Sequence, residues 1–424
     1  MSSAVSEAVA VGTGDETIPG PTLVDFEAAR VTVGAVIDET PMESSRSLSE
    51  VLGSDVWLKC ENLQRTGSYK IRGAYNRLVH LSDEDKARGV VAASAGNHAQ
   101  GVAFAARELG IHSTIFMPVG VALPKLAATK EYGADVELSG NVFDETLGAA
   151  VAFAEQTGAV FIPPFDHHDI IAGQGTLGLE ILEQLPDVDT ILVPIGGGGL
   201  ISGVASAVKQ KSAELGRTVK IIGVQASNAA AYPTSLIAGE PVQIQILPTI
   251  ADGIAVSKPG VLNFEIVRDT VDEVITVDED DIARALLVLL ERAKLVVEPA
   301  GAVGVAAILA GKVQHSGTTV AILSGGNIDP LVMERIISHG LAASERYLKL
   351  RIPLPDRPGQ LARTAQIIAD SNANVVEVLH TRHGNGMQIS QVVLELHIET
   401  RGPEHAELVI HNLREAGFEP ILEF

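Results

Sequence analysis

Short apolar runs alternate with amphipathic stretches from about residue 21 to residue 340. The runs have the length and the Val, Ile, Leu and Ala content of buried parallel strands, and the stretches between them, such as 99–109 and 280–295, have helical spacing. The clearest runs are 90–93, 113–117, 191–195, 221–224 and 320–323. This alternation predicts an α/β fold with a mostly parallel sheet, in which ligands bind beyond the carboxyl ends of the strands.

The pattern changes after about residue 340. Residues 347–352 alternate apolar and charged positions, and Pro358 lies near the first turn of a helix that opens at 356–359. Strands at 375–380 and 389–398, joined around Gly384-Asn385-Gly386, precede a helix at 405–416 and a strand at 418–422. The order βαββαβ predicts a ferredoxin-like α+β domain at 347–424. Residues 1–20 lack periodicity and are expected to form a flexible tail, which leaves 21–340 as the main domain, with a smaller lobe at roughly 70–165.

Composition narrows the possible partners and the cellular compartment. The chain has 424 residues, enough for two or three domains, and a net charge of -22, which argues against nucleic acid and anionic membranes as partners. An anionic ligand must then be held by local backbone donors. Cys60 is the only cysteine, Arg30 is the first basic residue, and no apolar run reaches membrane-spanning length. We therefore expect a cytoplasmic protein without an internal disulfide.

Two segments could carry an amine and an anion site. Lys70, in Ser68-Tyr69-Lys70-Ile71-Arg72-Gly73, precedes a helical pattern, where the helix N-terminus would lower the pKa of its amine. Alone, such a lysine is most simply a surface residue. The second segment follows the run 90–93 and comprises Ser94, Ala95, Gly96, Asn97 and His98. A small-residue loop between a strand and a helix offers free N–H groups to a carboxylate or phosphate, although an ordinary turn has the same pattern.

A glycine-rich turn is a stronger signal. It follows the strand ending at residue 195 and consists of Gly196, Gly197, Gly198, Gly199 and Leu200. Four glycines remove every Cβ, so the backbone can curl around a phosphate with its N–H groups inward; a flexible loop is the competing interpretation. The spacing matches neither a dinucleotide fingerprint nor a P-loop. Ser324, in Ser324-Gly325-Gly326-Asn327, ends another strand, where its hydroxyl could meet a ring nitrogen or simply form a turn.

Four motifs in this order resemble those of the fold-type II pyridoxal-phosphate (PLP) enzymes. They are TGSYKIRGA (66–74), SAGNHAQG (94–101), PIGGGGLISG (194–203) and LSGGN (323–327). The similarity is greatest to the threonine ammonia-lyase (threonine dehydratase) and serine dehydratase group, and covers about residues 21–340. It implies a two-lobed, tryptophan synthase β-like catalytic region with PLP as cofactor. The implied reaction removes water and ammonia from threonine to give 2-oxobutanoate, or from serine to give pyruvate.

The resemblance also implies a role for each motif. Lys70 would hold PLP as a Schiff base and act as the catalytic base, and Asn97 would contact the phenolic oxygen. Gly196 to Leu200 would hold the phosphate, and Ser324 would face the pyridine nitrogen. The substrate carboxylate would bind at Ser94 to His98, and Glu298 would lie near the ring. A neutral Ser324 cannot keep the ring nitrogen protonated, which favours β-elimination over transamination.

The C-terminal pattern resembles an ACT domain, a small module that commonly binds amino acids. The segment that carries this resemblance contains Asp356, Arg357, Gly359, Gln360 and Leu361. It implies an amino-acid effector, control of a branch point such as isoleucine biosynthesis, and a homo-oligomer, either dimer or tetramer.

Several alternatives remain. The main activity could be that of an L-serine dehydratase, or the chain could be a non-catalytic amino-acid sensor. Enzymes of β-replacement, such as cysteine synthase and threonine synthase, have a different lysine context. The related serine racemases carry a second serine where this chain has Ala95, which disfavours racemisation. The stretch from Gln225 to Ala231 lacks the carboxylates of their metal site, so no metal is predicted.

Overall fold

The computed structural model describes residues 20–314, 317–343, 346–382 and 391–422. The expected tail and the turn at 384–386 therefore lie outside the described residues. The chain divides into one compact unit that ends at Asp329 and a second that starts at Pro330. Each unit is described by itself.

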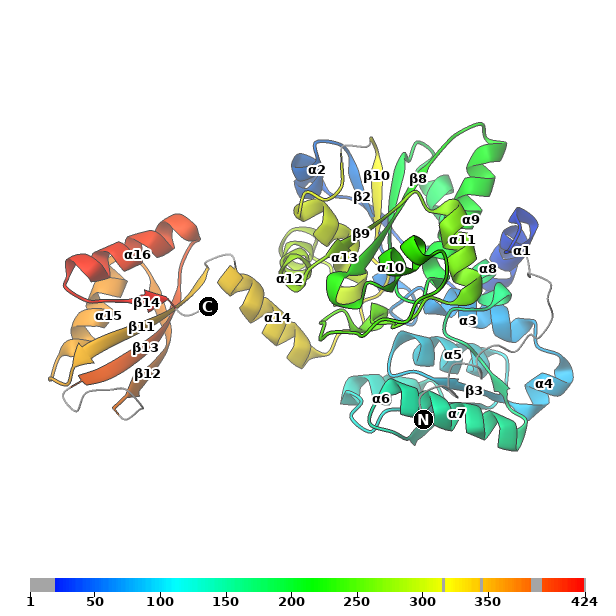
Figure 1. Cartoon of the computed structure of the whole chain (residues 1–424), viewed down its shortest axis with the longest axis horizontal. Helices are drawn as coiled ribbons and strands as arrows, with labels where there is room; N and C mark the ends of the chain where they lie inside the picture. The colour runs from blue at the N-terminus through cyan, green and yellow to red at the C-terminus, as the bar shows by residue number, and fades with distance from the viewer. Residues whose placement is uncertain (1–19, 315–316, 344–345, 383–390, 423–424) are drawn as a thin grey trace. The chain divides into compact units, whose positions relative to one another are not determined.

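The large lobe of the first unit is built on a six-stranded sheet in the order β1-β2-β10-β7-β8-β9, parallel except for β1. Its strands are β1 (Met42–Ser44), β2 (Val56–Lys59), β7 (Thr190–Pro194), β8 (Lys220–Ala226), β9 (Glu273–Val277) and β10 (Thr319–Ile322). Both faces carry helices, as expected for parallel strands that are apolar along their whole length (Figure 1). One face is covered by α2 (Arg46–Leu52), α12 (Glu279–Val288) and α13 (Pro299–Leu309), and the other by α8 (His168–Gln184), α9 (Gly199–Glu214) and α11 (Val261–Thr270).

The remaining elements of this lobe are short or peripheral. They are α1 (Leu23–Val33), which packs on α8, α10 (Ala231–Ala238), η1 (Glu61–Leu63), η2 (Ser227–Ala229), η3 (Asp252–Ile254) and η4 (Leu289–Ala293). The helix expected at 280–295 is thus α12 followed by the π-helical turn η4.

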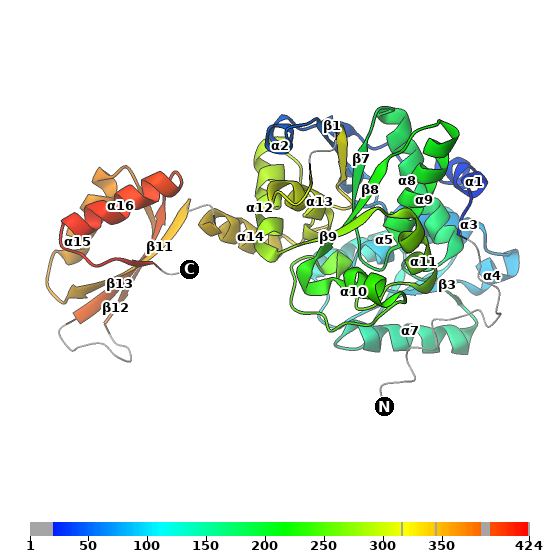
Figure 2. The ribbon, with the colours of Figure 1, turned by 45° about the horizontal axis from the view of Figure 1, so that its top comes forward.

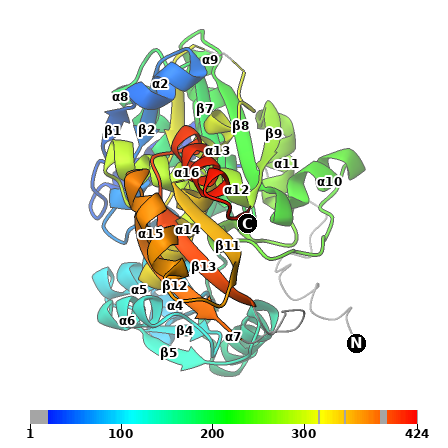
Figure 3. The same ribbon diagram turned by 90° about the vertical axis from the view of Figure 1, so that its left-hand side faces the viewer.

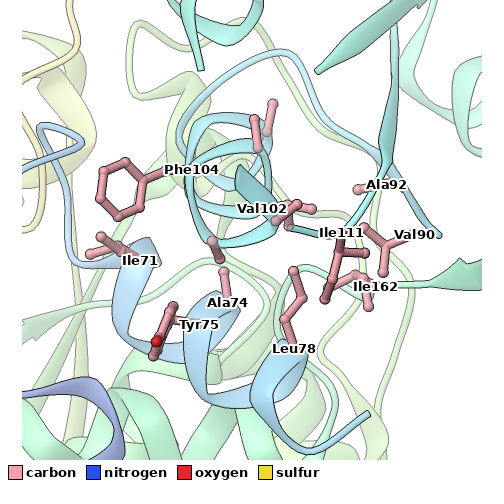
Figure 4. Close-up of a cluster of buried hydrophobic side chains, with 14 of the residues drawn as sticks. Ile71, Ala74, Tyr75, Leu78, Val90, Ala92, Val102, Phe104, Ile111 and Ile162 are labelled. Carbon is pink, nitrogen blue, oxygen red and sulfur yellow. The ribbon is translucent and has the colours of Figure 1, made fainter. Parts of the chain in front are cut away.

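The small lobe has a four-stranded parallel sheet in the order β5-β4-β3-β6, of which β4 and β5 are labelled in Figure 3. Its elements are β3 (Val90–Ala93), β4 (Ser113–Met117), β5 (Asp135–Leu138), β6 (Val160–Phe161), α3 (Lys70–Val79), α4 (Asp83–Arg88), α5 (Asn97–Glu108), α6 (Leu123–Glu131) and α7 (Phe143–Thr157). Val90 and Ala92 face Ile71, Leu78 and Val102 of α3 and α5 (Figure 4), whereas the alternate strand residues pack toward α7. Burial on both faces explains the unbroken apolar run of β3.

Helix α3 joins the two lobes, because it packs against α5 on one side and α8 on the other. Glycines permit the close approach. A Cβ on Gly101 of α5 would lie 3.2 Å from the Lys70 carbonyl carbon, and one on Gly173 of α8 would lie 2.6 Å from the Cα of Gly73. The start of α3, and with it Lys70, is therefore held between two helices.

The second unit contains α14 (Pro330–Ala343), β11 (Tyr347–Pro355), α15 (Gln360–Asp370), β12 (Asn374–Thr381), β13 (Gln391–Glu399), α16 (Pro403–Glu415) and β14 (Ile421–Leu422). Its antiparallel sheet has the order β12-β13-β11-β14, and α15 and α16 lie on one face of it (Figure 2). This is the predicted ferredoxin-like layout.

The fold class is confirmed: the five apolar runs are β3, β4, β7, β8 and β10. Some local boundaries differ from the prediction, two of them in the second unit. The helix expected from 356–359 begins at Gln360, because Gly359 adopts a φ of 90° as its N-cap and Pro358 lies before the first turn. The strand expected at 418–422 is paired only at Ile421 and Leu422.

Candidate active site

Two of the four motifs are joined directly by backbone pairing. Ser68 forms an isolated antiparallel bridge with Gly325, and the Tyr69 N–H donates to the Ser324 carbonyl at 3.1 Å. Gly326 donates to the carbonyl of Gly67 at 2.8 Å. The loop after β10 thus fixes the residues just before Lys70, and Ser324 is buried.

Lys70 is the first residue of α3, and its half-buried amine donates to the carbonyl of Pro164 at 3.0 Å. The amine also lies 5.3 Å from the centre of the Tyr69 ring. Desolvation lowers the pKa of Lys70 from 10.5 to about 8, and the carboxyl group of Glu298 partly opposes this shift. An amine with this pKa is deprotonated often enough near neutral pH to act as a base or nucleophile.

A buried ionic network, absent from the predicted site, anchors the next turn of α3. The Arg72 guanidinium donates to both oxygens of Glu61 at 2.8 Å and lies 2.8 Å from Glu180. Lys59 reaches Glu180 at 2.5 Å, and all four side chains are buried. Two cations and two anions balance, and the Arg72–Glu61 pair is bidentate, which is the arrangement that makes burial of charge tolerable.

Hydrogen bonds link Asn97, in the small lobe, to two residues of the large lobe. Its Nδ2 donates to Glu298 Oε1 at 2.7 Å, and its Oδ1 accepts from Asn327 Nδ2 at 2.9 Å. Burial of Glu298, next to the negative charge of Asp252, raises the pKa of its carboxyl group from 4.5 to about 7. Asn97 and Glu298 were predicted to lie near the cofactor ring; they lie in contact with each other.

The predicted carboxylate loop lies between β3 and α5. Gly96 is the N-cap of α5, and its N–H donates to Ser94 Oγ at 3.2 Å. The His98 side chain is buried and points elsewhere, with Nε2 3.0 Å from the Ile162 carbonyl. Burial lowers the pKa of His98 to about 3, so the ring is neutral and donates this bond. The side chain of His98 therefore positions the loop.

The glycine turn between β7 and α9 has no room for side chains. A Cβ on Gly197 would overlap with the ring of Phe165, and one on Gly198, where φ is 109°, would overlap with the hydroxyl of Tyr232. A Cβ on Gly199 would lie 2.8 Å from Cβ of Phe165. Within the described residues, the N–H groups of 196–200 donate to no protein acceptor. Free N–H groups at a helix N-terminus fit a phosphate group.

Two hydrogen bonds fix a carbonyl group of the glycine turn. Gly197 O accepts from the Tyr232 hydroxyl at 3.2 Å and from the Gly260 N–H at 3.1 Å. Asp166 in turn accepts the N–H groups of Val261 and Asn263 at 2.8 and 3.2 Å, which caps α11. The peptide of Gly197 is therefore fixed through its carbonyl oxygen.

The segment 162–167 contacts several parts of the site, and no motif in the sequence identified it. It supplies the carbonyl of Ile162 to His98, the carbonyl of Pro164 to Lys70, the ring of Phe165 to the glycine turn and the carboxylate of Asp166 to α11. Its Pro-Pro pair lacks periodicity, and only its position after the short strand β6 could have identified it.

Other predicted features are as follows. Within the described residues, no group of three or more His, Cys, Asp or Glu side chains is arranged to hold a metal ion. At the stretch compared with the racemase metal site, Gln225 Nε2 lies 3.4 Å from the carbonyl of Ile195 and 3.5 Å from that of Ala229.

None of the described helices is long and apolar enough to cross a membrane. The predicted effector segment is an exposed turn between β11 and α15, where Asp356 lies 3.5 Å from Arg382.

The family comparison agrees with this geometry. The family model described as "Pyridoxal-phosphate dependent enzyme" matches residues 33–325. The chain therefore belongs to the PLP-dependent enzymes, and PLP is its cofactor. An L-threonine ammonia-lyase of Thermotoga maritima is 50% identical over 399 residues, which cover 94% of this chain and 98% of the relative. The predicted likeness to threonine ammonia-lyases, and with it the enzyme class of lyase, is confirmed.

Two solved structures show the same similarity over about three quarters of the chain. The processed form of threonine deaminase isoform 2 from Solanum lycopersicum has a TM-score of 0.70 and 35% identity, covering 76% of this chain and 98% of its own. Maize serine racemase has a TM-score of 0.70 and 36% identity, covering 77% of this chain and 99% of its own. The fold and the family thus rest on sequence and structure together.

Proposed function

We propose that this chain converts L-threonine into 2-oxobutanoate and ammonia. The amine of Lys70 carries the proposal, because it lies at the start of α3 and its pKa is lowered. The backbone there is held by pairing with the Ser324 loop and by the close packing of α5. The substrate is inferred from the relative that is 50% identical over 94% of the chain. The reaction balances: the β-hydroxyl leaves as water, and a water molecule later replaces the nitrogen, which leaves as ammonia.

The residues of the site divide the work. PLP, when bound, supplies the electron sink that stabilises negative charge at the substrate Cα. The N–H groups of 196–200 would hold its phosphate, and Ser324 would face its ring nitrogen as a neutral hydroxyl. Lys70 would carry the cofactor and take the proton from the substrate Cα, for which a pKa of about 8 is well matched. The loop 94–98 would bind the substrate carboxylate.

L-Serine is a second candidate substrate, which would give pyruvate by the same chemistry. The likeness to maize serine racemase supports it. Racemisation is not proposed, because it needs a base on each side of the Cα, and Ala95 has no hydroxyl group. Replacement of Ser324 by Asp would protonate the ring nitrogen and shift the partitioning toward transamination; unchanged partitioning would refute the role given to Ser324.

The test of this function is product analysis with L-threonine and L-serine on the full-length protein loaded with PLP. We expect 2-oxobutanoate from threonine and pyruvate from serine, and borohydride should fix the cofactor to residue 70. Lys70→Ala should lose both products and the covalent cofactor, whereas Lys209→Ala, in the C-terminal half of α9, serves as a surface-lysine control. Absence of 2-oxobutanoate from the wild type would refute the proposal.

The second unit is proposed to act as an ACT-type regulatory module for an amino acid, with the segment 356–361 as the contact site. Its ferredoxin-like order and the exposed turn at 356–359 support this role. Truncation after about residue 342 should remove any change of activity by branched-chain amino acids and spare the chemistry. An equal effector response in the truncated protein would refute it. We also propose a homo-oligomer, which light scattering would test.

A further inference from the structure

An ion pair connects the two lobes beside the carboxylate loop. Lys125, on α6 of the small lobe, lies with Nζ 2.8 Å from Oδ2 of Asp252, on η3 of the large lobe. The two partners differ in burial: the Lys125 side chain is 18% exposed and that of Asp252 is 63% exposed. A carboxylate that stands mostly in water binds its partner weakly, so another anion can displace it.

The ammonium group has a specific neighbour. A Cβ built on Gly96 would lie 3.9 Å from Lys125 Nζ, which places the amine beside the N-cap of α5. Asp252 and Lys125 both act on the charge of Glu298, the first raising and the second lowering its pKa. Gly253, next to Asp252, approaches the same carboxyl group, because a Cβ there would lie 3.6 Å from Glu298 Oε1.

A cation at this position would favour the binding of an anionic substrate. The chain has a net charge of -22, and the loop 94–98 offers a carboxylate only neutral N–H and hydroxyl donors, since the neutral ring of His98 bonds the Ile162 carbonyl instead. The proposed function assigns the ammonium group of Lys70 to the cofactor and the Cα proton. Lys125 supplies a second ammonium group, and another anion can replace Asp252 as its partner.

We propose that Lys125 is a specificity-determining residue that binds the carboxylate of the amino-acid substrate, and that Asp252 competes with the substrate for this ammonium group. The inference rests on the proposed function, since it takes the loop 94–98 as the carboxylate site. In this proposal the carboxylate of the substrate replaces Asp252 as the partner of Lys125, whereas an amine without a carboxylate cannot.

The two members of the pair give variants with opposite predicted effects. In the full-length holoenzyme, Lys125→Gln should raise the KM for L-threonine by about tenfold or more with a smaller change of kcat, which corresponds to loss of one charge-assisted contact. Asp252→Asn should lower the KM, because it removes the competitor, and Lys125→Arg should restore most of the affinity. A pair that merely held the lobes together would shift the KM in the same direction in both variants, and that result, or no shift in either, would overturn the proposal.

Ligand binding without turnover provides a separate readout. L-Alanine has no β-leaving group, and isopropylamine has the same carbon skeleton without the carboxylate; binding of each is followed by the absorbance of the bound cofactor. Lys125→Gln should weaken L-alanine and leave isopropylamine unchanged, and equal weakening of both would overturn the proposal. Lys209→Gln, which breaks the 2.7 Å pair with Asp272, is the matched control and should change neither. If wild type binds L-alanine but makes no 2-oxobutanoate, the proposed function fails while this assay still decides the role of Lys125.

Discussion

Replacement of Lys70 by Met should make the cofactor-free protein more stable while it abolishes activity. The Lys70 amine loses hydration at the start of α3, which is why its pKa is about 8 instead of 10.5. At roughly 1.4 kcal/mol per pKa unit, a charged Lys70 lowers the free energy of unfolding by about 3 kcal/mol at pH 7. Met has a similar shape and no charge, but it leaves the carbonyl of Pro164 without its donor, at a cost of about 1 kcal/mol. A net gain of about 2 kcal/mol remains.

The pH dependence identifies the cause of this gain. A lysine with a depressed pKa in the folded state costs nothing above its unfolded pKa of 10.5, and the full cost is present below the folded pKa of about 8. Wild-type stability should therefore rise relative to the Met variant between pH 8 and pH 10.5. The advantage of Lys70→Met should be largest at pH 7 and shrink by about 2 kcal/mol at pH 9.5.

Urea denaturation followed by tryptophan fluorescence provides the assay. Trp57 is the only tryptophan and lies in β2, so its emission reports the catalytic unit and not the C-terminal one. Lys209→Met, which removes the 2.7 Å pair with Asp272, is the control for the loss of a lysine elsewhere in the unit. A Lys70→Met variant that is less stable than wild type at pH 7, or whose advantage does not change with pH, would refute the account of Lys70.

Three further perturbations probe other parts of the site. Gly198→Ala should weaken PLP binding by at least about tenfold, because the new methyl group overlaps the hydroxyl of Tyr232. Titration with PLP followed by absorbance measures this change. Gly216→Ala, also at positive φ but in open space, is the control and should leave PLP binding unchanged. Glu298→Gln should flatten the dependence of thermal stability on pH between about 4.5 and 7. The pKa of Glu298 is about 7 instead of 4.5, so its proton stabilises the fold fully below pH 4.5, and this stabilisation is lost as the pH rises through about 7. A profile like that of wild type would contradict the burial of this carboxyl group. Arg72→Met should destabilise the catalytic unit by about 3–5 kcal/mol in urea, because Glu61 is left buried without its partner, whereas a loss below about 1 kcal/mol would mean that the network is dispensable.

Three of the predicted parts of the site share one property: each is a loop directly after an apolar strand. The glycine turn, the loop 94–98 and Ser324 follow β7, β3 and β10, and parallel strands bring their carboxyl ends to one edge of each sheet. Periodicity and small residues are enough to find such loops, and their order along the chain provided the family.

The parts that were missed depend on contacts between distant residues. Arg72, Glu61, Lys59 and Glu180 form a buried network, but in the sequence a charged residue is read as a surface residue. The partners Lys125 and Asp252 are separated by 127 positions, and no local pattern joins them. In both cases the contacts form only when the chain is packed.

Chemical rescue of Lys70→Ala tests the central claim most directly. The PLP-loaded variant is mixed with L-threonine and increasing concentrations of methylamine, and 2-oxobutanoate is measured beside the wild type. The account predicts rapid 2-oxobutanoate formation by wild type, none by the variant alone, and a rate that grows with the concentration of methylamine, because the small amine can occupy the space of the lost side chain and accept the Cα proton. Formation of 2-oxobutanoate by Lys70→Ala without added amine would contradict the role of Lys70.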